Sequence, residues 1–278
     1  MTTSTAPETD RPIVLNCNDA VTAEEIGHVL LVTINRPDAR NSVNPDVIRG
    51  VGKALEHAEQ CPGVWVVVIT GAGDKAFCAG ADLKAAAAGA FNEMGEELEK
   101  WGFAGFVKHH ISKPTIAAVN GFALGGGTEI VLASDLAVAS SEATFGLPEV
   151  KRGIFAGAGG AFRIGRQVPK KIAMEILLTG QPLTAQRALE IGLINRAVPQ
   201  DQVLDAALEL ANLICENAPL AVQTSKRIAN AISDGKVHSE DDDWARSEAE
   251  GQALMLSQDS REGMLAFAEK RAPKWQGQ

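Results

Sequence analysis

The sequence predicts an α/β fold in which short strands alternate with turns and helices, followed by a region that is helical almost throughout. The first sign is a series of short strand patterns between residues 28 and 139, separated by glycine-rich turns and helical segments. The second is the helical periodicity that takes over from about Pro169. With 278 residues, 45% of them hydrophobic, the chain is long enough for a sizeable core.

The N-terminal third supplies the first elements. Residues 1 to 26 show no sustained periodicity, and we expect a loose arm. Residues 28–35 predict a strand that the Arg36-Pro37 turn closes. A capping Asn44, followed by proline and a carboxylate, predicts a helix that runs toward Gln60. Residues 64–70 are apolar throughout and predict a buried strand.

The next elements surround a glycine-rich turn. Residues 115–120 and 135–139 predict short strands, with a helix between them near residues 128–133. The helical region then predicts segments near 169–179, 184–191, 200–217, 219–233, 240–257 and 259–270. We therefore divide the chain into an arm (1–26), a core that carries the active site (27–200) and a helical C-terminal region (201–278) that serves as a lid or an assembly surface.

Charge and composition exclude several functions. The formal net charge of −9 disfavours a nucleic-acid-binding surface, which needs a basic face. No run approaches the roughly 18 apolar residues of a membrane span, and the first ten residues lack the basic cluster of a signal peptide. We therefore expect a cytoplasmic protein without a membrane partner.

Cysteine and histidine patterns predict no metal site. The four cysteines are scattered, form no C-x-x-C pair and are expected to be reduced thiols: Cys17, Cys61, Cys78 and Cys215. His109-His110 lies in a helical stretch without a partner motif, which favours a surface or packing role. The sequence also lacks a G-x-S-x-G elbow, a G-x-x-x-x-G-K phosphate loop and an H-E-x-x-H helix.

One glycine motif matches a nucleotide-binding pattern. Residues 71–76 (GAGDKA) follow the predicted buried strand and fit G-x-G-x-x-G/A. The residues after them, 77–82 (FCAGAD), have no helical period and contain another glycine turn where the binding helix of a Rossmann unit would begin. This context favours a tight strand-to-strand turn over a dinucleotide site.

Two further glycine turns are better candidates for chemistry. Residues 78–84 (CAGADLK) combine small residues with a predicted helix start at Asp82. Residues 120–129 (NGFALGGGTE) repeat the arrangement of strand, glycines and helix, with a carboxylate in the first helical turn. Two backbone N–H donors that converge from such turns would form an oxyanion hole for a thioester carbonyl.

A pair of glutamates lies beside these turns in the sequence. Glu129 is on the helix after the second turn, and Glu149 follows Pro148 in a loop that leads to the glycine-rich residues 157–160. Hydration of a polarised alkene needs one group that activates water and another that delivers a proton to carbon, and two glutamates can do both. We therefore expect both to be catalytic.

Together these motifs resemble those of the crotonase superfamily, and most closely those of enoyl-CoA hydratases. The resemblance runs from about His28 to Trp275. It rests on four motifs in order: Asn35-Arg36-Pro37 followed by Asn41-Ser42-Val43-Asn44, then residues 77–83 (FCAGADL), residues 120–129 (NGFALGGGTE), and residues 145–149 (FGLPE) with their Gly-Ala-Gly-Gly sequel.

The resemblance implies a fold, an activity and a set of roles. The fold would be the crotonase (ClpP-like) spiral of ββα units with a helical C-terminal trimerisation region, assembled as a homotrimer or as a hexamer of two trimers. The N–H groups of Ala81 and Gly126 would form the oxyanion hole. Glu129 would activate the water that attacks the β-carbon of a trans-2-enoyl-CoA, and Glu149 would deliver the proton to the α-carbon. Coenzyme A would enter as part of the substrate, with no permanently bound cofactor.

The resemblance also implies where coenzyme A is held. Phe267 and Lys270 match residues that touch its nucleotide end in a neighbouring subunit, and Arg40 would reach a phosphate, which answers the need for local positive charge in an acidic chain. Lys84 and Lys274 are weaker candidates. The remaining expected contacts lie beside Lys84 on the first glycine turn: Ala79, Asp82 and Leu83.

Some residues depart from the usual hydratase pattern. Thr128 replaces a frequent cysteine, and residues 151–155 (KRGIF) add charge and bulk after Glu149. Both leave the acyl group open, and so does the variable segment between Lys84 and Lys108; straight-chain, branched and sterol-derived groups are all compatible. Double-bond isomerisation, dehydration, thioester hydrolysis and carbon–carbon cleavage are alternative reactions. Acyl-CoA or RNA binding without turnover is a third class of function, which the charge and the two glutamates disfavour.

Overall fold

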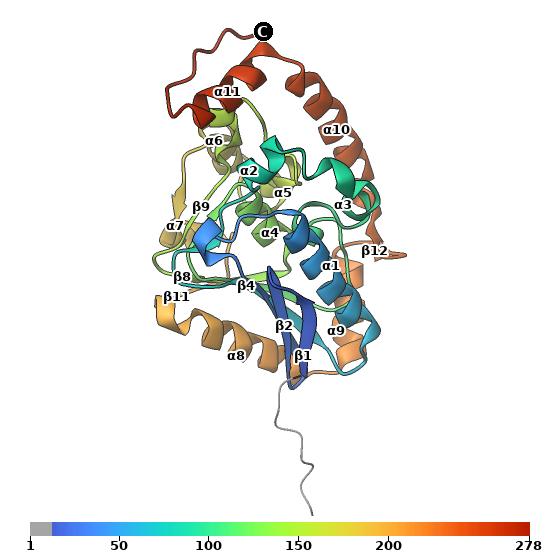
Figure 1. The fold of residues 1–278 in the computed structure, drawn as a ribbon. Coiled ribbons are helices and arrows are strands. Elements are labelled where there is room, and N and C mark those ends of the chain that lie inside the picture. Colours follow the sequence, from blue (N-terminus) through green and yellow to red (C-terminus); the bar gives the residue numbers. More distant parts are fainter. Residues whose placement is uncertain (1–12) are drawn as a thin grey trace, which may run out of the picture.

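The computed structural model describes residues 13–278, which form two stacked sheets enclosed by helices (Figure 1). The larger sheet has seven strands in the order β1-β2-β3-β4-β6-β8-β11. Its first three strands are antiparallel neighbours and the others run parallel. Their bounds are β1 Ile13–Asn18, β2 Val21–Ile26, β3 Val29–Ile34, β4 Val66–Gly71, β6 Thr115–Val119, β8 Leu136–Ser140 and β11 Arg196–Val198.

The smaller sheet lies beside the larger one, and the chain alternates between the two sheets. It has the order β10-β9-β7-β5, with bounds β5 Ala76–Cys78, β7 Phe122–Leu124, β9 Thr144–Gly146 and β10 Leu183–Thr184. A strand of the larger sheet precedes each of β5, β7 and β9 in the chain, and a helix or helical turn follows. This repeat is the spiral of ββα units expected from the family resemblance.

Helices surround the two sheets, and the expected segments are present with ends that differ by a few residues. They are α1 Pro45–Gln60, α2 Leu83–Ala87, α3 Gly95–Trp101, α4 Gly126–Ala133, α5 Gly160–Gln167, α6 Lys170–Thr179, α7 Ala185–Glu190, α8 Val203–Cys215, α9 Pro219–Ala229, α10 Asp241–Met255 and α11 Gln258–Ala268. Short 3-10 turns connect them: η1 Pro37–Ala39, η2 Asn92–Met94, η3 Phe103–Gly105, η4 Pro148–Arg152, η5 Gln200–Gln202 and η6 His238–Glu240. A small hairpin, β12 Ile232–Ser233 and β13 Lys236–Val237, separates α9 from η6.

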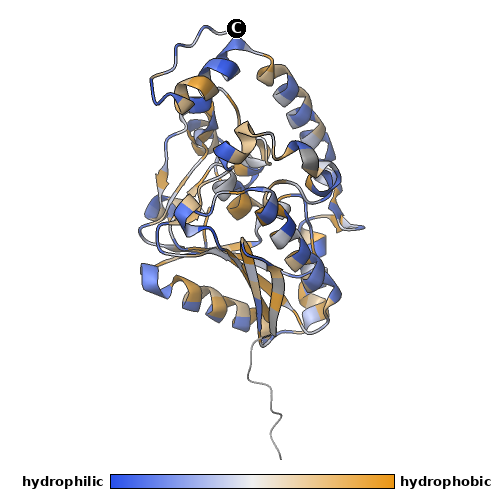
Figure 2. Ribbon diagram, viewed as in Figure 1, coloured by the Kyte–Doolittle hydropathy of each residue, from blue (hydrophilic) through white to orange (hydrophobic). Residues whose placement is uncertain are grey.

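The core has two layers, one on each face of the larger sheet. On one face, the sheet packs against α1 and the second sheet, and on the other it packs against α8 through Val203, Ala207 and Ala211. The central strand β4 is therefore covered on both sides, which explains why its sequence is apolar without alternation. Figure 2 shows the apolar residues concentrated in these strands.

The expectation of a loose arm over residues 1–26 was wrong for residues 13–26. They form the β1–β2 hairpin, and β2 pairs with β3 along its whole length, from Val21 opposite Ile34 to Ile26 opposite Val29. The Asn18 side chain accepts hydrogen bonds from the N–H groups of Ala20 and Val21, which shapes the turn. Residues 1–12 lie outside the described part of the chain.

The C-terminal helices contact the core of this chain. Helix α11 packs on η4, and a side chain at Gly263 would collide with the backbone of Arg152. Figure 1 places α10 and α11 at the end of the molecule opposite α8. Across residues 13–278, no helix combines the length and the apolar character needed to cross a membrane.

Candidate active site

The two glycine turns expected to carry chemistry meet in the structure. β5 and β7 are parallel neighbours in the smaller sheet, so the turns that follow them leave the sheet at the same edge. Gly80 has a φ of 92°, and a Cβ there would lie 3.4 Å from the N of Gly126. A Cβ on Gly127 would overlap the carbonyl oxygen of Cys78. Only residues without side chains allow this approach.

Ala81 and Gly126 lie at this junction, and their N–H groups have no protein hydrogen-bond partner among residues 13–278. Val43 forms hydrogen bonds with the residues on either side of Ala81. Its N–H donates to the oxygen of Gly80 over 2.8 Å, and its oxygen accepts from the N–H of Asp82 over 2.8 Å. Gly126 opens helix α4, where the first N–H groups have no intrahelical acceptor. Both donors are therefore available to a ligand oxygen.

Glu129 lies one turn into α4 and is 3% exposed. Its Oε1 accepts a hydrogen bond of 2.9 Å from the N–H of Gly160, the first residue of α5. Burial, and after it the negative charge of Glu149, raises the pKa of Glu129 from 4.5 to about 8. A carboxyl group of this kind can exchange a proton near neutral pH.

Glu149 reaches the same junction from η4. A Cβ on Gly125 would lie 2.9 Å from its Oε1, so the carboxylate sits against the second glycine turn. Its Oε2 is buried and has no hydrogen-bond partner in the described part of the chain. Burial raises the pKa of Glu149 to about 7. A buried, unpartnered carboxylate oxygen is costly in a protein interior, and such oxygens are typical of sites that bind a ligand.

Thr128, which stood out in the sequence only as a departure from the usual hydratase pattern, connects the elements of the site by hydrogen bonds. Its hydroxyl donates to the oxygen of Ala123 over 2.6 Å and accepts from the N–H of Gly146 over 3.0 Å. These bonds connect β7, α4 and β9 and so fix the helix that carries Glu129. Thr128 is 1% exposed, so it supports the position of Glu129 from within the core.

The residues expected to bind coenzyme A around the first glycine turn are close together. Arg40 is exposed in the left-handed region, at φ 53°, and its oxygen accepts from the N–H of Ala79 over 3.1 Å. Leu83 and Lys84 are exposed at the start of α2. The Asp82 side chain is already occupied: it caps α2 and pairs with Arg36 at 2.9 Å. Its carboxylate therefore shapes the turn.

The C-terminal candidates lie on and just after α11. Phe267 is 42% exposed, and the guanidinium of Arg152 lies 4.2 Å from the centre of its ring. Lys270 follows the helix end with a φ of 56°. Since Arg152 belongs to η4, this contact connects Phe267 to the turn that carries Glu149 within the same chain.

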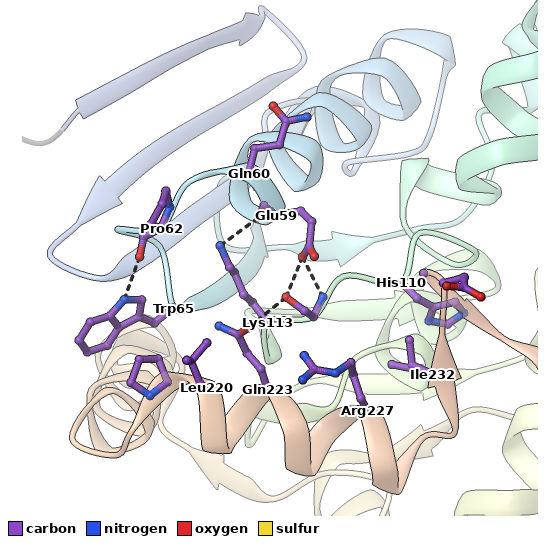
Figure 3. A pocket seen from close by; sticks show the side chains of 14 residues that line it. Glu59, Gln60, Pro62, Trp65, His110, Lys113, Leu220, Gln223, Arg227 and Ile232 are labelled. Atoms are coloured by element: carbon purple, nitrogen blue, oxygen red, sulfur yellow. Dashed lines mark hydrogen bonds between the residues drawn. The ribbon is translucent and has the colours of Figure 1, made fainter.

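A pocket of about 510 Å³ lies elsewhere, between the end of α1 and helix α9 (Figure 3). Neither Glu129 nor Glu149 lines it. Lys113 donates to the oxygen of Cys61 over 2.7 Å, and Ser112 donates to Glu59 over 3.0 Å, so the side chains of Lys113 and Ser112 are already engaged with neighbouring protein groups. Its lining gives no reason to place the chemistry there.

The fold also gathers Glu25, His57 and Cys61, whose side-chain ligand atoms lie within 4.8 Å of one another. No sequence pattern indicates this group, because Glu25 is on β2 and the other two are at the end of α1. Glu25 and His57 are already joined by a hydrogen bond of 2.6 Å. They satisfy each other without a metal ion.

The fold and the geometry of this site define a crotonase-type enzyme that acts on acyl-CoA thioesters. Comparison with known proteins agrees: the sequence model of the family described as enoyl-CoA hydratase/isomerase matches residues 24–278, and the chain belongs to that family.

Individual relatives are similar over almost their whole length. A carnitinyl-CoA dehydratase of Proteus mirabilis is 40% identical over 264 residues, which cover 90% of this chain and 96% of the relative. The enoyl-CoA hydratase EchA19 of Mycobacterium tuberculosis is 40% identical, covering 91% and 95%. A crystal structure of a carnitinyl-CoA hydratase from Mycobacterium avium is 57% identical with a TM-score of 0.91, covering 94% of this chain and all of the other.

Proposed function

We propose that this protein is an enoyl-CoA hydratase, which adds water reversibly to a trans-2-enoyl-CoA and yields a 3-hydroxyacyl-CoA. The observation that carries the proposal is the pair of buried glutamates, Glu129 and Glu149, beside two backbone N–H groups that have no partner in the part of the chain that the structure describes. An isomerase needs only one acid–base carboxylate, whereas addition of water uses two.

In the proposed mechanism, the N–H groups of Ala81 and Gly126 bind the thioester oxygen and stabilise the enolate-like charge that develops there. Glu129 accepts a proton from water as the oxygen attacks the β-carbon, and Glu149 gives its proton to the α-carbon. The water is thus divided between the two carbons, and the glutamate pair holds one proton before and after the reaction. In dehydration the two glutamates exchange roles.

The direct test is the loss of the conjugated-thioester absorbance of crotonyl-CoA and of a longer trans-2-enoyl-CoA. We expect rapid loss with at least one of them. The similarity to proteins named carnitinyl-CoA dehydratase and hydratase favours a second candidate substrate, carnitinyl-CoA, whose dehydration would raise the same absorbance. Absence of any change with all three thioesters would overturn the proposal.

The pH dependence should be bell-shaped and narrow. Both reaction directions require one proton on the pair, and its pKa values are raised to about 7 for Glu149 and about 8 for Glu129. Below pH 7 both groups are protonated, and above pH 8 both are ionised, so kcat/KM should peak between these values and fall about tenfold per unit outside them. A flat profile from pH 5 to 9 would contradict this assignment. Measurements with a pH-stable enoyl-CoA at constant ionic strength would decide.

We propose that coenzyme A is held by the loop of Arg40 and Ala79 and by the start of α2, with Phe267 and Lys270 touching its nucleotide end in a neighbouring subunit, and that no other cofactor is bound permanently. Arg40 and Lys84 are exposed and make no ion pair within residues 13–278. They are suited to phosphate groups. We further propose that the protein acts in the cytoplasm.

We propose a homotrimer, or a hexamer of two trimers. The helical C-terminal region exposes large apolar side chains, including Leu220 at 74%, Ile228 at 77% and Leu256 at 75%. Such side chains on several helices favour an assembly surface. Sedimentation should give about three or six times the chain mass of 29.3 kDa. A monomer at micromolar concentration would contradict this proposal.

A further inference from the structure

The catalytic base is held by a segment that has its own support. The N–H of Gly160 donates to Glu129 Oε1, and a Cβ at Gly160 would lie 2.9 Å from that same oxygen. The position of residues 155–160 therefore sets the orientation of the Glu129 carboxylate. The contacts that hold residues 155–160 in place therefore contribute to the geometry of the active site.

Helix α5, which begins at Gly160, carries Arg163 one turn further on. Its Nε donates to Glu240 Oε1 over 3.0 Å, and its Nη2 donates to Glu240 Oε2 over 2.7 Å and to the oxygen of Val107 over 2.8 Å. Arg163 is 4% exposed and Glu240 is 7% exposed. This is a bidentate, buried ion pair between residues 77 positions apart in the sequence.

Helix α10, which begins right after Glu240, contacts the supporting segment at two points. Gly159 has a φ of 100°, and a Cβ there would lie 3.2 Å from the Trp244 ring and 3.0 Å from Arg163 Nη1. Further along the helix, a Cβ on Gly251 would lie 3.1 Å from the ring of Phe155. The Trp244 ring also meets Phe162 edge-on, with centroids 5.0 Å apart.

We propose that the Arg163–Glu240 ion pair, with Trp244, positions residues 155–160 so that Gly160 holds the Glu129 carboxylate. Helix α10 thereby contributes to the orientation of the catalytic base. Arg163 and Glu240 are positioning residues, since Glu129 acts on the substrate and they do not touch it. The inference rests on the proposed role of Glu129.

A purely structural ion pair would behave differently. Buried ion pairs often contribute little net stability, and their replacement can be neutral. Here the pair lies close enough to Glu129 for the positive charge of Arg163 to oppose the rise in the pKa of Glu129. Besides burial, the negative charge of Glu149, from η4, raises the pKa of Glu129, and burial together with the charge of Glu129 raises the pKa of the neighbouring Cys78 on β5. Burial lowers the pKa of the neighbouring His110 to about 4, so His110 is neutral throughout the working range.

The test compares three variants with the wild type: Arg163→Lys, Glu240→Gln and the double variant Arg163→Gln with Glu240→Gln. Arg163→Lys keeps the charge and loses the bidentate geometry, so we expect kcat to fall roughly 10- to 100-fold with KM nearly unchanged. The alkaline limb of the pH profile, the fall in kcat/KM above pH 8, should stay in place. Glu240→Gln leaves the charge of Arg163 unopposed and should shift that limb to lower pH by roughly 0.5 unit. The double variant should shift it to higher pH, because the cation is gone.

The matched control is Glu209→Gln, which breaks the exposed pair with Arg196; Glu209 is on α8, at the end of the molecule opposite α10 (Figure 1). We expect it to leave kcat, KM and the pH profile unchanged. Hydrogen exchange of residues 155–163, measured without substrate, gives a readout that does not depend on activity. It should be faster in Arg163→Lys than in the wild type and unchanged in the control.

The outcomes separate this inference from the proposed function. If the wild type acts on no enoyl-CoA or carnitinyl-CoA while exchange of residues 155–163 responds as expected, the proposed reaction fails and the positioning role stands. If the wild type is active and the variants show neither altered exchange nor opposite shifts of the alkaline limb, the positioning role is overturned. The double variant removes both charges together, so it avoids an uncompensated buried charge should a single variant fail to fold.

Discussion

Replacing Glu129 with Gln is expected to lower kcat by about 10⁴-fold, with a much smaller change in KM. Gln keeps the shape of the side chain and an oxygen that can accept from Gly160, whose N–H lies 2.9 Å from Glu129 Oε1 in the wild type. It cannot accept a proton from water, so the loss falls on the chemical step. General acid–base groups contribute about 10²- to 10⁴-fold, and this one also sits in a buried site. Initial rates with crotonyl-CoA would measure the effect.

The stability of the same variant provides the control for folding. The folded-state pKa of Glu129, about 8, lies above the ordinary value of 4.5. Between these values the folded state holds a proton that the unfolded state has released, so this group stabilises the fold less as pH rises from 4.5 to 8. Glu129→Gln removes that dependence. Its melting temperature should exceed that of the wild type above pH 8, and the difference should shrink toward pH 5. Near-normal turnover in this well-folded variant would exclude Glu129 as the base.

Much of the fold could be predicted because each of its main elements carries a local pattern. The apolar run at residues 64–70 predicted β4, and Asn44 with Pro45 predicted the start of α1. Strand β2 was missed because Glu24 and Glu25 interrupt its apolar pattern, although Val21 and Ala23 are fully buried. Its strand character comes from pairing with β3, a tertiary contact.

The same distinction applies to the site. Both glutamates and both glycine turns could be found from the sequence, because glycines that clear space for a ligand form recognisable clusters. Gly160, whose N–H donates to Glu129, also lies in a recognisable motif, the glycine-rich residues 157–160. The pair of Arg163 with Glu240 could not be found, since it joins residues far apart in the chain and each of them resembles an ordinary charged side chain on a helix.

The oxyanion hole should be the second most sensitive part of the site. Gly127→Ala places a Cβ only 2.0 Å from the Cys78 carbonyl oxygen, which is backbone and cannot rotate away. The turns that carry Ala81 and Gly126 must then move apart, and the two N–H groups can no longer point at one oxygen. Loss of one such donor lowers kcat by about 10²- to 10³-fold, and we expect at least that loss. Stopped assays of crotonyl-CoA hydration at saturating substrate would measure it.

Gly165→Ala is the matched control, because Gly165 lies in helix α5 and a Cβ there would meet nothing within 4 Å. Alanine at an open helical position stabilises by about 1 kcal/mol, so this variant should be fully active and slightly more stable. Gly127→Ala should lose activity even at temperatures where its circular dichroism matches that of the wild type. Equal activity of the two variants would mean that the approach of the 78–84 and 125–127 turns does not build the thioester site, and the donors would have to be sought elsewhere.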